Sequence, residues 1–235
     1  MTISAPNVLL PITHLISDCD GVLIDSEAVA LHALLDVLEA RFGQRERLAT
    51  LIQPMLGLMI SPLLRALYTE LGAPTPQAAE LEHVVTVVEA ECDRLLSAVP
   101  GVAQALAAIP LPKAVASNSS NGRVRDALRR TGLAPLFDGR IYTSDMVARP
   151  KPQPDVYLAA AAGFGVAPGQ CLVLEDSVTG VTAAAAAGMT VLGFIGGGHI
   201  APGQRARLEA AGAYTCFDSM AALPALVAQL TARAA

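Results

Sequence analysis

The sequence has few cysteines, and none of them stands in a pattern that binds a metal. Cys19, Cys92, Cys171 and Cys216 are scattered along the 235 residues, without a CxxC pair and without a histidine at metal-ligand spacing. This distribution argues against a zinc site and against a framework of disulfide bonds. We therefore expect a protein of the reducing cytoplasm.

Extended basic segments are also lacking, since the longest run of basic residues is Arg129–Arg130 and the formal net charge is -5. Proteins that bind nucleic acids or anionic membranes present clustered positive charge. The sequence therefore predicts a small-molecule partner, no nucleic acid and no membrane, in a monomer or a weak dimer.

The sequence has no basic segment near its start, so we expect no secretory signal. Only Ser177–Gln204 is uncharged over a length that raises the question of a membrane span. Glycines at 188, 193 and 196–198 interrupt this stretch, which favours a helix, a turn and a short strand. We expect no transmembrane segment.

Apolar residues make up 53% of the chain and charged residues 16%, which excludes a disordered protein. Five short apolar runs have the length of strands, and most precede a helix-like segment. They are His14–Ile16, Lys113–Ala116, Arg140–Tyr142, Cys171–Leu174 and Thr190–Ile195. This alternation predicts an α/β fold with a Rossmann-like parallel sheet and helices on both faces.

The pattern changes between Glu27 and Val99, where strand-like runs vanish and amphipathic helices take over. The segments SEAVALHALLDVLEARFG and AAELEHVVTVVEAECDRLLSAV both carry apolar residues at helical spacing. We expect an all-helical cap domain at 27–97, inserted into an α/β core domain made of 1–26 and 98–235.

Polar residues follow the predicted strands where each of them ends. They are Asp18 and Asp20, Ser117 and Asn118, Lys151 in the loop ARPKPQPD, and Glu175 with Asp176. In open α/β sheets, ligands bind at the carboxyl ends of the strands. We therefore expect these side chains to meet at one edge of the sheet.

Asp18 and Asp20 stand two residues apart, so an extended chain presents both on one face, and Gly21 permits a sharp turn after them. Four converging carboxylates would be destabilising if all were ionised and unpaired. A hard divalent cation resolves this repulsion. The sequence predicts a Mg²⁺ site, and its candidate residues are Asp18, Asp20, Glu175 and Asp176.

Ser117, Asn118 and Lys151 complete a predicted phosphate-binding site. The hydroxyl of Ser117 and the N–H groups near the next helix start can donate to phosphate oxygens, and Lys151 offers a compact positive charge. Phosphoryl transfer requires this distribution of charge. The alternative interpretations are a helix cap for Ser117, a local turn for Asn118 and solvated carboxylates at the end of a strand for Asp18 and Asp20.

Four ordered motifs resemble those of the haloacid dehalogenase superfamily, in its branch of sugar-phosphate phosphatases and β-phosphoglucomutase-like enzymes. They are DCDGVLIDSE, the Ser117 of ASNS, the Lys151 of RPKPQPDVY, and LEDS at 174–177. The resemblance covers about residues 14–195, and it also implies that the helical insert is a cap over the substrate.

The resemblance implies that Asp18 is a nucleophile that forms an aspartyl-phosphate, and that Asp20 is the general acid and base. It implies that Mg²⁺ is held by a side-chain oxygen of Asp18, the backbone carbonyl of Asp20, and Asp176 with Glu175 assisting. The predicted catalytic set is Asp18, Asp20, Ser117 and Lys151.

The expected function is Mg²⁺-dependent hydrolysis of small sugar or polyol phosphates. The alternative is a phosphomutase of the β-phosphoglucomutase type. Such mutases carry a histidine at the position of Ala30 and basic residues near 56–60, and this chain has neither. Whether His199 or the cap loop at 55–61 contacts the substrate stays open.

Two other activities fit less well. Dehalogenases of this superfamily lack the second aspartate and need no metal, so Asp20 and Asp176 argue against that reaction. A non-catalytic protein that binds phosphorylated metabolites has no need of the nucleophile Asp18.

Overall fold

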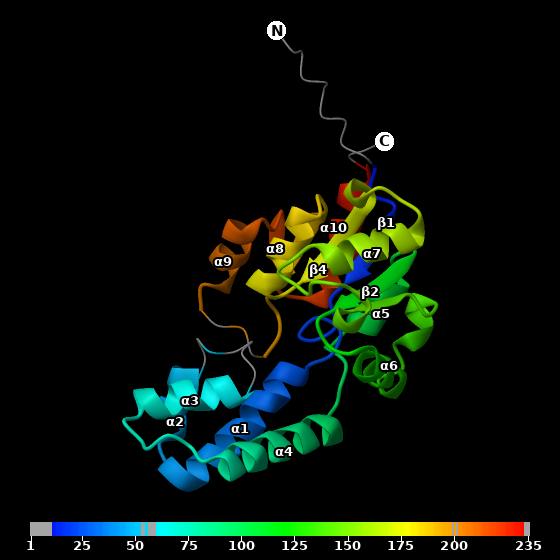
Figure 1. The fold of residues 1–235 in the computed structure, drawn as a ribbon. Coiled ribbons are helices and arrows are strands. Elements are labelled where there is room, and N and C mark those ends of the chain that lie inside the picture. The colour runs from blue at the N-terminus through cyan, green and yellow to red at the C-terminus, as the bar shows by residue number, and fades with distance from the viewer. Residues whose placement is uncertain (1–10, 53–54, 56–59, 199, 201, 233–235) are drawn as a thin grey trace.

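The computed structural model describes residues 11–52, 55, 60–198, 200 and 202–232. These residues contain a six-stranded parallel sheet with the strand order β3-β2-β1-β4-β5-β6 (Figure 1). The strands are β1 (His14–Ser17), β2 (Lys113–Ser117), β3 (Ile141–Thr143), β4 (Cys171–Glu175), β5 (Thr190–Phe194) and β6 (Thr215–Phe217). The predicted α/β fold with a parallel sheet is confirmed.

Helices cover both faces of this sheet. The neighbouring residues Leu15 and Ile16 of β1 belong to two different buried clusters, because successive side chains of a strand point to opposite faces. The cluster with Leu15 contains side chains of α5 (Val102–Ala107), α6 (Asn121–Arg130) and α10 (Leu223–Ala232), and the cluster with Ile16 contains side chains of α7 (Asp155–Phe164), α8 (Val178–Ala186) and α9 (Gln204–Ala211). Short 3-10 turns are η2 (Ala134–Phe137), η3 (Ser144–Met146), η4 (Pro168–Gln170) and η5 (Met220–Ala222).

Four helices of the predicted cap region form a separate lobe at the end of the molecule far from both termini (Figure 1). They are α1 (Ser26–Phe42), α2 (Arg45–Ile52), α3 (Ile60–Glu70) and α4 (Ala78–Arg94). Leu38, Leu64 and Val88 belong to a buried cluster made only of residues from this lobe. The division into a core of 1–26 and 98–235 and a cap of 27–97 stays a proposal, which this separate cluster supports.

The chain leaves the core and returns to it through two adjacent segments. The N–H of Asp25 donates to the carbonyl of Ser97 (3.0 Å), and the N–H of Val99 donates to the carbonyl of Leu23 (2.9 Å). The helical lobe is therefore joined to the core by two short, paired connections.

Among the described residues, no helix is both long enough and apolar enough to span a lipid bilayer. The uncharged stretch after Ser177 contains α8 and β5, as its glycines predict. Ser177 caps α8 by accepting a hydrogen bond from the N–H of Gly180.

Candidate active site

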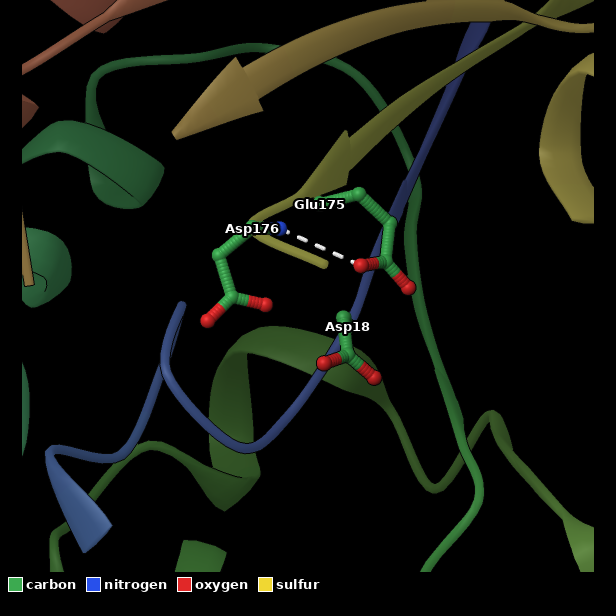
Figure 2. A group of neighbouring side chains, drawn as sticks. All are labelled: Asp18, Glu175 and Asp176. Carbon is green, nitrogen blue, oxygen red and sulfur yellow. Dashed lines mark hydrogen bonds between the residues drawn. The ribbon is translucent and has the colours of Figure 1, made fainter. Parts of the chain in front are cut away.

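Three of the four predicted acidic residues, Asp18, Glu175 and Asp176, meet where β1 and β4 end. These strands are hydrogen-bonded neighbours, and Ser17 of β1 pairs with Leu174 of β4. Asp18 follows β1, and Glu175 and Asp176 close β4, so the register brings the three carboxyl groups together. Figure 2 shows these acids gathered at this edge of the sheet, and all three are buried.

Lys151 reaches this acidic group from the loop before α7. Its Nζ lies 2.7 Å from Oδ1 of Asp18 and 2.6 Å from Oε1 of Glu175, and the residue is 6% exposed. Burial lowers the pKa of Lys151, but the charges of Asp18 and Glu175 outweigh it and hold that pKa well above its ordinary value. The lysine is therefore an ammonium ion at neutral pH.

Burial raises the pKa of Asp18, and the charges of Glu175 and Asp176 raise it further, while Lys151 opposes them. Lys151 contacts two of the three carboxyl groups in this cluster, those of Asp18 and Glu175. A second cation would offset the remaining repulsion and favour the ionised form of Asp18.

The residues present fit a hard divalent metal ion. Asp18, Glu175 and Asp176 each offer a carboxylate oxygen, and these oxygens lie within 4.8 Å of one another. Carboxylate oxygens at such spacing are ligands that Mg²⁺ and Ca²⁺ accept. This buried acidic group can therefore bind a metal.

Both carboxylate oxygens of Glu175 accept hydrogen bonds. Its Oε1 accepts hydrogen bonds from Nζ of Lys151 and from the hydroxyl of Tyr157 (2.7 Å). Its Oε2 accepts from the N–H groups of Asp176 (3.1 Å) and Ser177 (3.2 Å) and from the hydroxyl of Ser177 (3.0 Å); Figure 2 draws the bond from Asp176. Since donors already occupy both of its oxygens, Glu175 is poorly suited to bind a metal directly.

Tyr157 is a site residue that the sequence reasoning missed. Its side chain is fully buried in α7, and its ring centroid lies 4.9 Å from Nζ of Lys151. One signal was available, because a tyrosine on the apolar face of an alanine-rich helix needs an acceptor for its hydroxyl.

Asp20 lies outside the acidic cluster and nearer to solvent. Its Oδ2 accepts a hydrogen bond from the hydroxyl of Ser119 (2.7 Å), and its Oδ1 lies 3.9 Å from Nη2 of Arg123. Cys19, between the two aspartates, is 2% exposed and packs in the core. Asp18 and Asp20 thus occupy different environments, as the two predicted roles require.

Ser117 and Asn118 stand where β2 ends, and Asn118 contacts the lysine loop. The hydroxyl oxygen of Ser117 accepts a hydrogen bond from the N–H of Ser119 (3.0 Å). The side chain of Asn118 bonds both backbone groups of Lys151, accepting from its N–H (2.9 Å) and donating to its carbonyl (3.1 Å). Asn118 therefore fixes the lysine loop, and the phosphate contacts expected for Ser117 and Asn118 stay predictions.

The start of α6 also has a partner within the chain. The N–H of Asn121 donates to both carboxylate oxygens of Asp145 (3.3 and 3.2 Å), and the hydroxyl of Thr143 donates to Oδ1 as well. These hydrogen bonds, led by that from Thr143, lower the pKa of Asp145. The phosphate that was expected near this helix start would have to be bound by other N–H groups.

A cavity of about 330 Å³ opens beside Asp20, between α4 of the helical lobe and α6 of the core. Most of its lining side chains are polar or charged, including Asp20, Glu89, Asp93, Ser119, Arg123 and Arg130. The groups that line this cavity can both donate and accept hydrogen bonds.

Two earlier expectations concern residues beyond those that the structure describes. His199 lies outside the described residues, and so does 56–59 of the cap loop at 55–61. Contacts of His199 and of this loop with a substrate stay predictions.

A family model for haloacid dehalogenase-like hydrolases matches residues 12–188. The 6-phosphogluconate phosphatase of Escherichia coli is 28% identical over 186 residues, which are 79% of this chain and 83% of that protein. A probable pseudouridine-5'-phosphatase of Drosophila melanogaster is 33% identical over 195 residues (80% and 84%), and hexitol phosphatase B of E. coli is 33% identical over 178 residues (74% and 79%).

Solved structures share the fold over almost the whole chain. A haloacid dehalogenase-like protein of Agrobacterium tumefaciens matches with a TM-score of 0.84 and 36% identity, covering 93% of this chain and 99% of that chain. A family hydrolase of Deinococcus radiodurans with bound phosphate and sodium matches with a TM-score of 0.82 and 33% identity, covering 94% of this chain and 96% of that chain. A putative β-phosphoglucomutase of Thermotoga maritima matches with a TM-score of 0.70 and 26% identity, covering 93% of this chain and 99% of that chain.

Proposed function

The chain belongs to the haloacid dehalogenase-like hydrolase family, and we propose that it hydrolyses small sugar or polyol phosphates with the help of Mg²⁺. The predicted enzyme class, a phosphoric monoester hydrolase of this family, is confirmed by the family match and by the phosphatases among its relatives. One observation carries the proposed chemistry: a buried lysine lies against Asp18 at the sheet edge where the three acids meet.

We infer that Asp18 is the nucleophile. Its carboxylate oxygen attacks the phosphorus of the substrate, the bond to the leaving oxygen breaks, and an aspartyl-phosphate forms. Lys151 neutralises charge on the phosphoryl oxygens during this transfer, because its ammonium group lies 2.7 Å from the attacking carboxylate.

Asp20 is the proposed general acid and base. It donates a proton to the leaving oxygen in the first step, and it then takes a proton from the water that attacks the aspartyl-phosphate. Its side chain is 27% exposed and lines the cavity between α4 and α6, which supports this role.

Asp18, Asp176 and the backbone carbonyl of Asp20 are the proposed ligands of the cation. Bound there, Mg²⁺ would neutralise the carboxylates and draw charge from the phosphoryl oxygens. Ser117 and Lys151 are left to bind phosphate oxygens from the opposite side.

The lining of the cavity beside Asp20 supports the proposal that the leaving group carries hydroxyl groups. Its mixed donors and acceptors suit a sugar or a polyol better than an apolar alcohol, and a cavity of about 330 Å³ falls within the size range of small-ligand sites. The named activities of the relatives, on phosphogluconate and hexitol phosphates, agree with this substrate class.

The phosphomutase alternative is supported by likeness to a putative β-phosphoglucomutase. Ala30 argues against it, because the alanine side chain, packed against the cluster of the helical lobe, cannot bind or transfer a proton. The expected cytoplasmic location and the monomer or weak dimer stay predictions.

The test is a screen of phosphate release from sugar, polyol and nucleoside monophosphates with Mg²⁺. A hexose phosphate primed with the matching bisphosphate is included to detect mutase activity. We expect hydrolysis of at least one sugar or polyol phosphate. Isomerisation without net release of phosphate would favour the mutase, and inactivity toward every ester would overturn the proposal.

A further inference from the structure

The carboxylate of Glu175 occupies space that exists because residue 180 has no side chain. A Cβ placed on Gly180 would lie 1.7 Å from Oε1 of Glu175 and 2.0 Å from its Cδ, far inside van der Waals contact. The φ of Gly180 lies outside the positive range that favours glycine, and helical propensity alone would favour alanine there. The close approach of Glu175 is therefore what excludes a side chain from this position.

Tyr157 closes the same pocket from α7. Its hydroxyl donates to Oε1 of Glu175, the oxygen that also accepts from Lys151. Its ring lies beside Nζ of Lys151, with the centroid 4.9 Å away. Tyr157 thus contacts both members of the buried ion pair.

Glu175 is the link between these two residues and the nucleophile. It is fully buried, and its Oε1 holds Nζ of Lys151 at 2.6 Å while Asp18 holds the same nitrogen at 2.7 Å. A shift of the Glu175 carboxylate would therefore move the ammonium group relative to the attacking oxygen.

We propose that Gly180 and Tyr157 are positioning residues for the phosphoryl transfer, acting through Glu175 on Lys151. This inference rests on the proposed function, since Lys151 needs a fixed position only if it stabilises a transferring phosphoryl group. Neither residue touches the substrate in this scheme. A misplacement of about 1 Å at a reacting group can cost roughly 100-fold in rate.

The first experiment compares Gly180→Ala with Gly163→Ala, using p-nitrophenyl phosphate and saturating Mg²⁺. Gly163 is a matched control, because it also lies in a helix and a Cβ there would also meet a side-chain oxygen at 1.7 Å, that of Tyr142. We expect kcat of Gly180→Ala to fall by about tenfold or more with little change in KM. Gly163→Ala should keep kcat within about twofold even if its melting temperature falls.

A double-mutant cycle tests whether Gly180 acts through Glu175. Once Glu175→Ala has removed the carboxylate, the added methyl of Gly180→Ala has nothing to displace. The double variant should therefore have the same kcat as Glu175→Ala, within about twofold. A full additional loss in the double variant would overturn the proposal.

Tyr157→Phe supplies a test that adds no atoms, in case Gly180→Ala fails to fold. It removes only the hydroxyl bond to Glu175, so kcat should fall while KM and the circular dichroism spectrum stay nearly unchanged. Unchanged kcat in folded Gly180→Ala and Tyr157→Phe, with an active wild type, would overturn this inference alone. A wild type that releases no phosphate from any ester would overturn the proposed function itself.

Discussion

The Nζ of Lys151 lies 2.7 Å from Oδ1 of Asp18, although 133 positions separate the two residues in the chain. Both are buried, so the pair is shielded from solvent and salt. A lysine that only balanced buried charge could pair with any of the acids. This one contacts Glu175 and also Asp18, the proposed nucleophile, which agrees with the proposed chemistry.

Replacing Asp18 by asparagine should abolish turnover while leaving the fold intact. The substitution removes the nucleophilic oxygen and its charge at nearly constant volume, and Lys151 keeps Glu175 as its partner. We expect kcat for p-nitrophenyl phosphate to fall by more than about 10³-fold. Circular dichroism and thermal unfolding check the fold, and kcat near the wild-type value would refute Asp18 as the nucleophile.

Chelation should stop the reaction, and Mg²⁺ should restore it. Added Mg²⁺ should also raise the melting temperature, because it binds the native acidic cluster and offsets its repulsion. Asp176→Asn should raise the Mg²⁺ concentration needed for half of the thermal shift by about tenfold or more. Activity that persists in EDTA, or a melting temperature indifferent to Mg²⁺ in the wild type, would contradict the metal site.

The sequence predicted the sheet and the acidic cluster because both depend on local patterns. Strand length, apolar runs and the polar residues that follow them place Asp18 and Asp176 at one edge once a parallel sheet is assumed. The edge strand β6 (Thr215–Phe217) was not predicted.

Contacts between distant segments were beyond the sequence. The side chain of Asn118 bonds the backbone of Lys151, which is 33 positions away in the chain. The sequence predicted Asn118 as a phosphate ligand and gave no sign of this contact. The fit of Glu175 against Gly180 likewise depends on where the first turn of α8 lies relative to the end of β4. Such packing follows from tertiary geometry, on which motif spacing carries no information.

The pairing of Asp145 with the start of α6 should depend on pH. Its pKa is lowered in the folded protein, so its contribution to stability is present above the unfolded pKa of about 3.9 and is lost as pH falls through the lower folded pKa. The difference in melting temperature between the wild type and Asp145→Ala should therefore be larger at pH 7 than at pH 3. An equal difference in melting temperature at pH 7 and pH 3 would show that the charge of Asp145 does not contribute to stability. Asp138→Ala is the control, because Asp138 is an exposed acid that pairs with Arg140.

Replacing Asp20 by asparagine should affect substrates according to their leaving groups. An alkoxide leaving from a sugar or a polyol needs a proton, whereas p-nitrophenolate leaves without one. We expect kcat to fall by about 10²-fold or more for a sugar phosphate and by a smaller factor for p-nitrophenyl phosphate, since only the later activation of water is then lost.

The variant Ser119→Ala tests whether the position of the Asp20 carboxylate matters apart from its role as a proton donor. It removes the hydrogen bond to Oδ2 of Asp20 but keeps the acid, so both substrates should lose activity by a similar, modest factor. An equal loss for the two substrates in Asp20→Asn would mean that Asp20 does not protonate the leaving oxygen. A selective loss for the sugar phosphate would assign that proton to Asp20, because the two substrates share every other step of phosphoryl transfer.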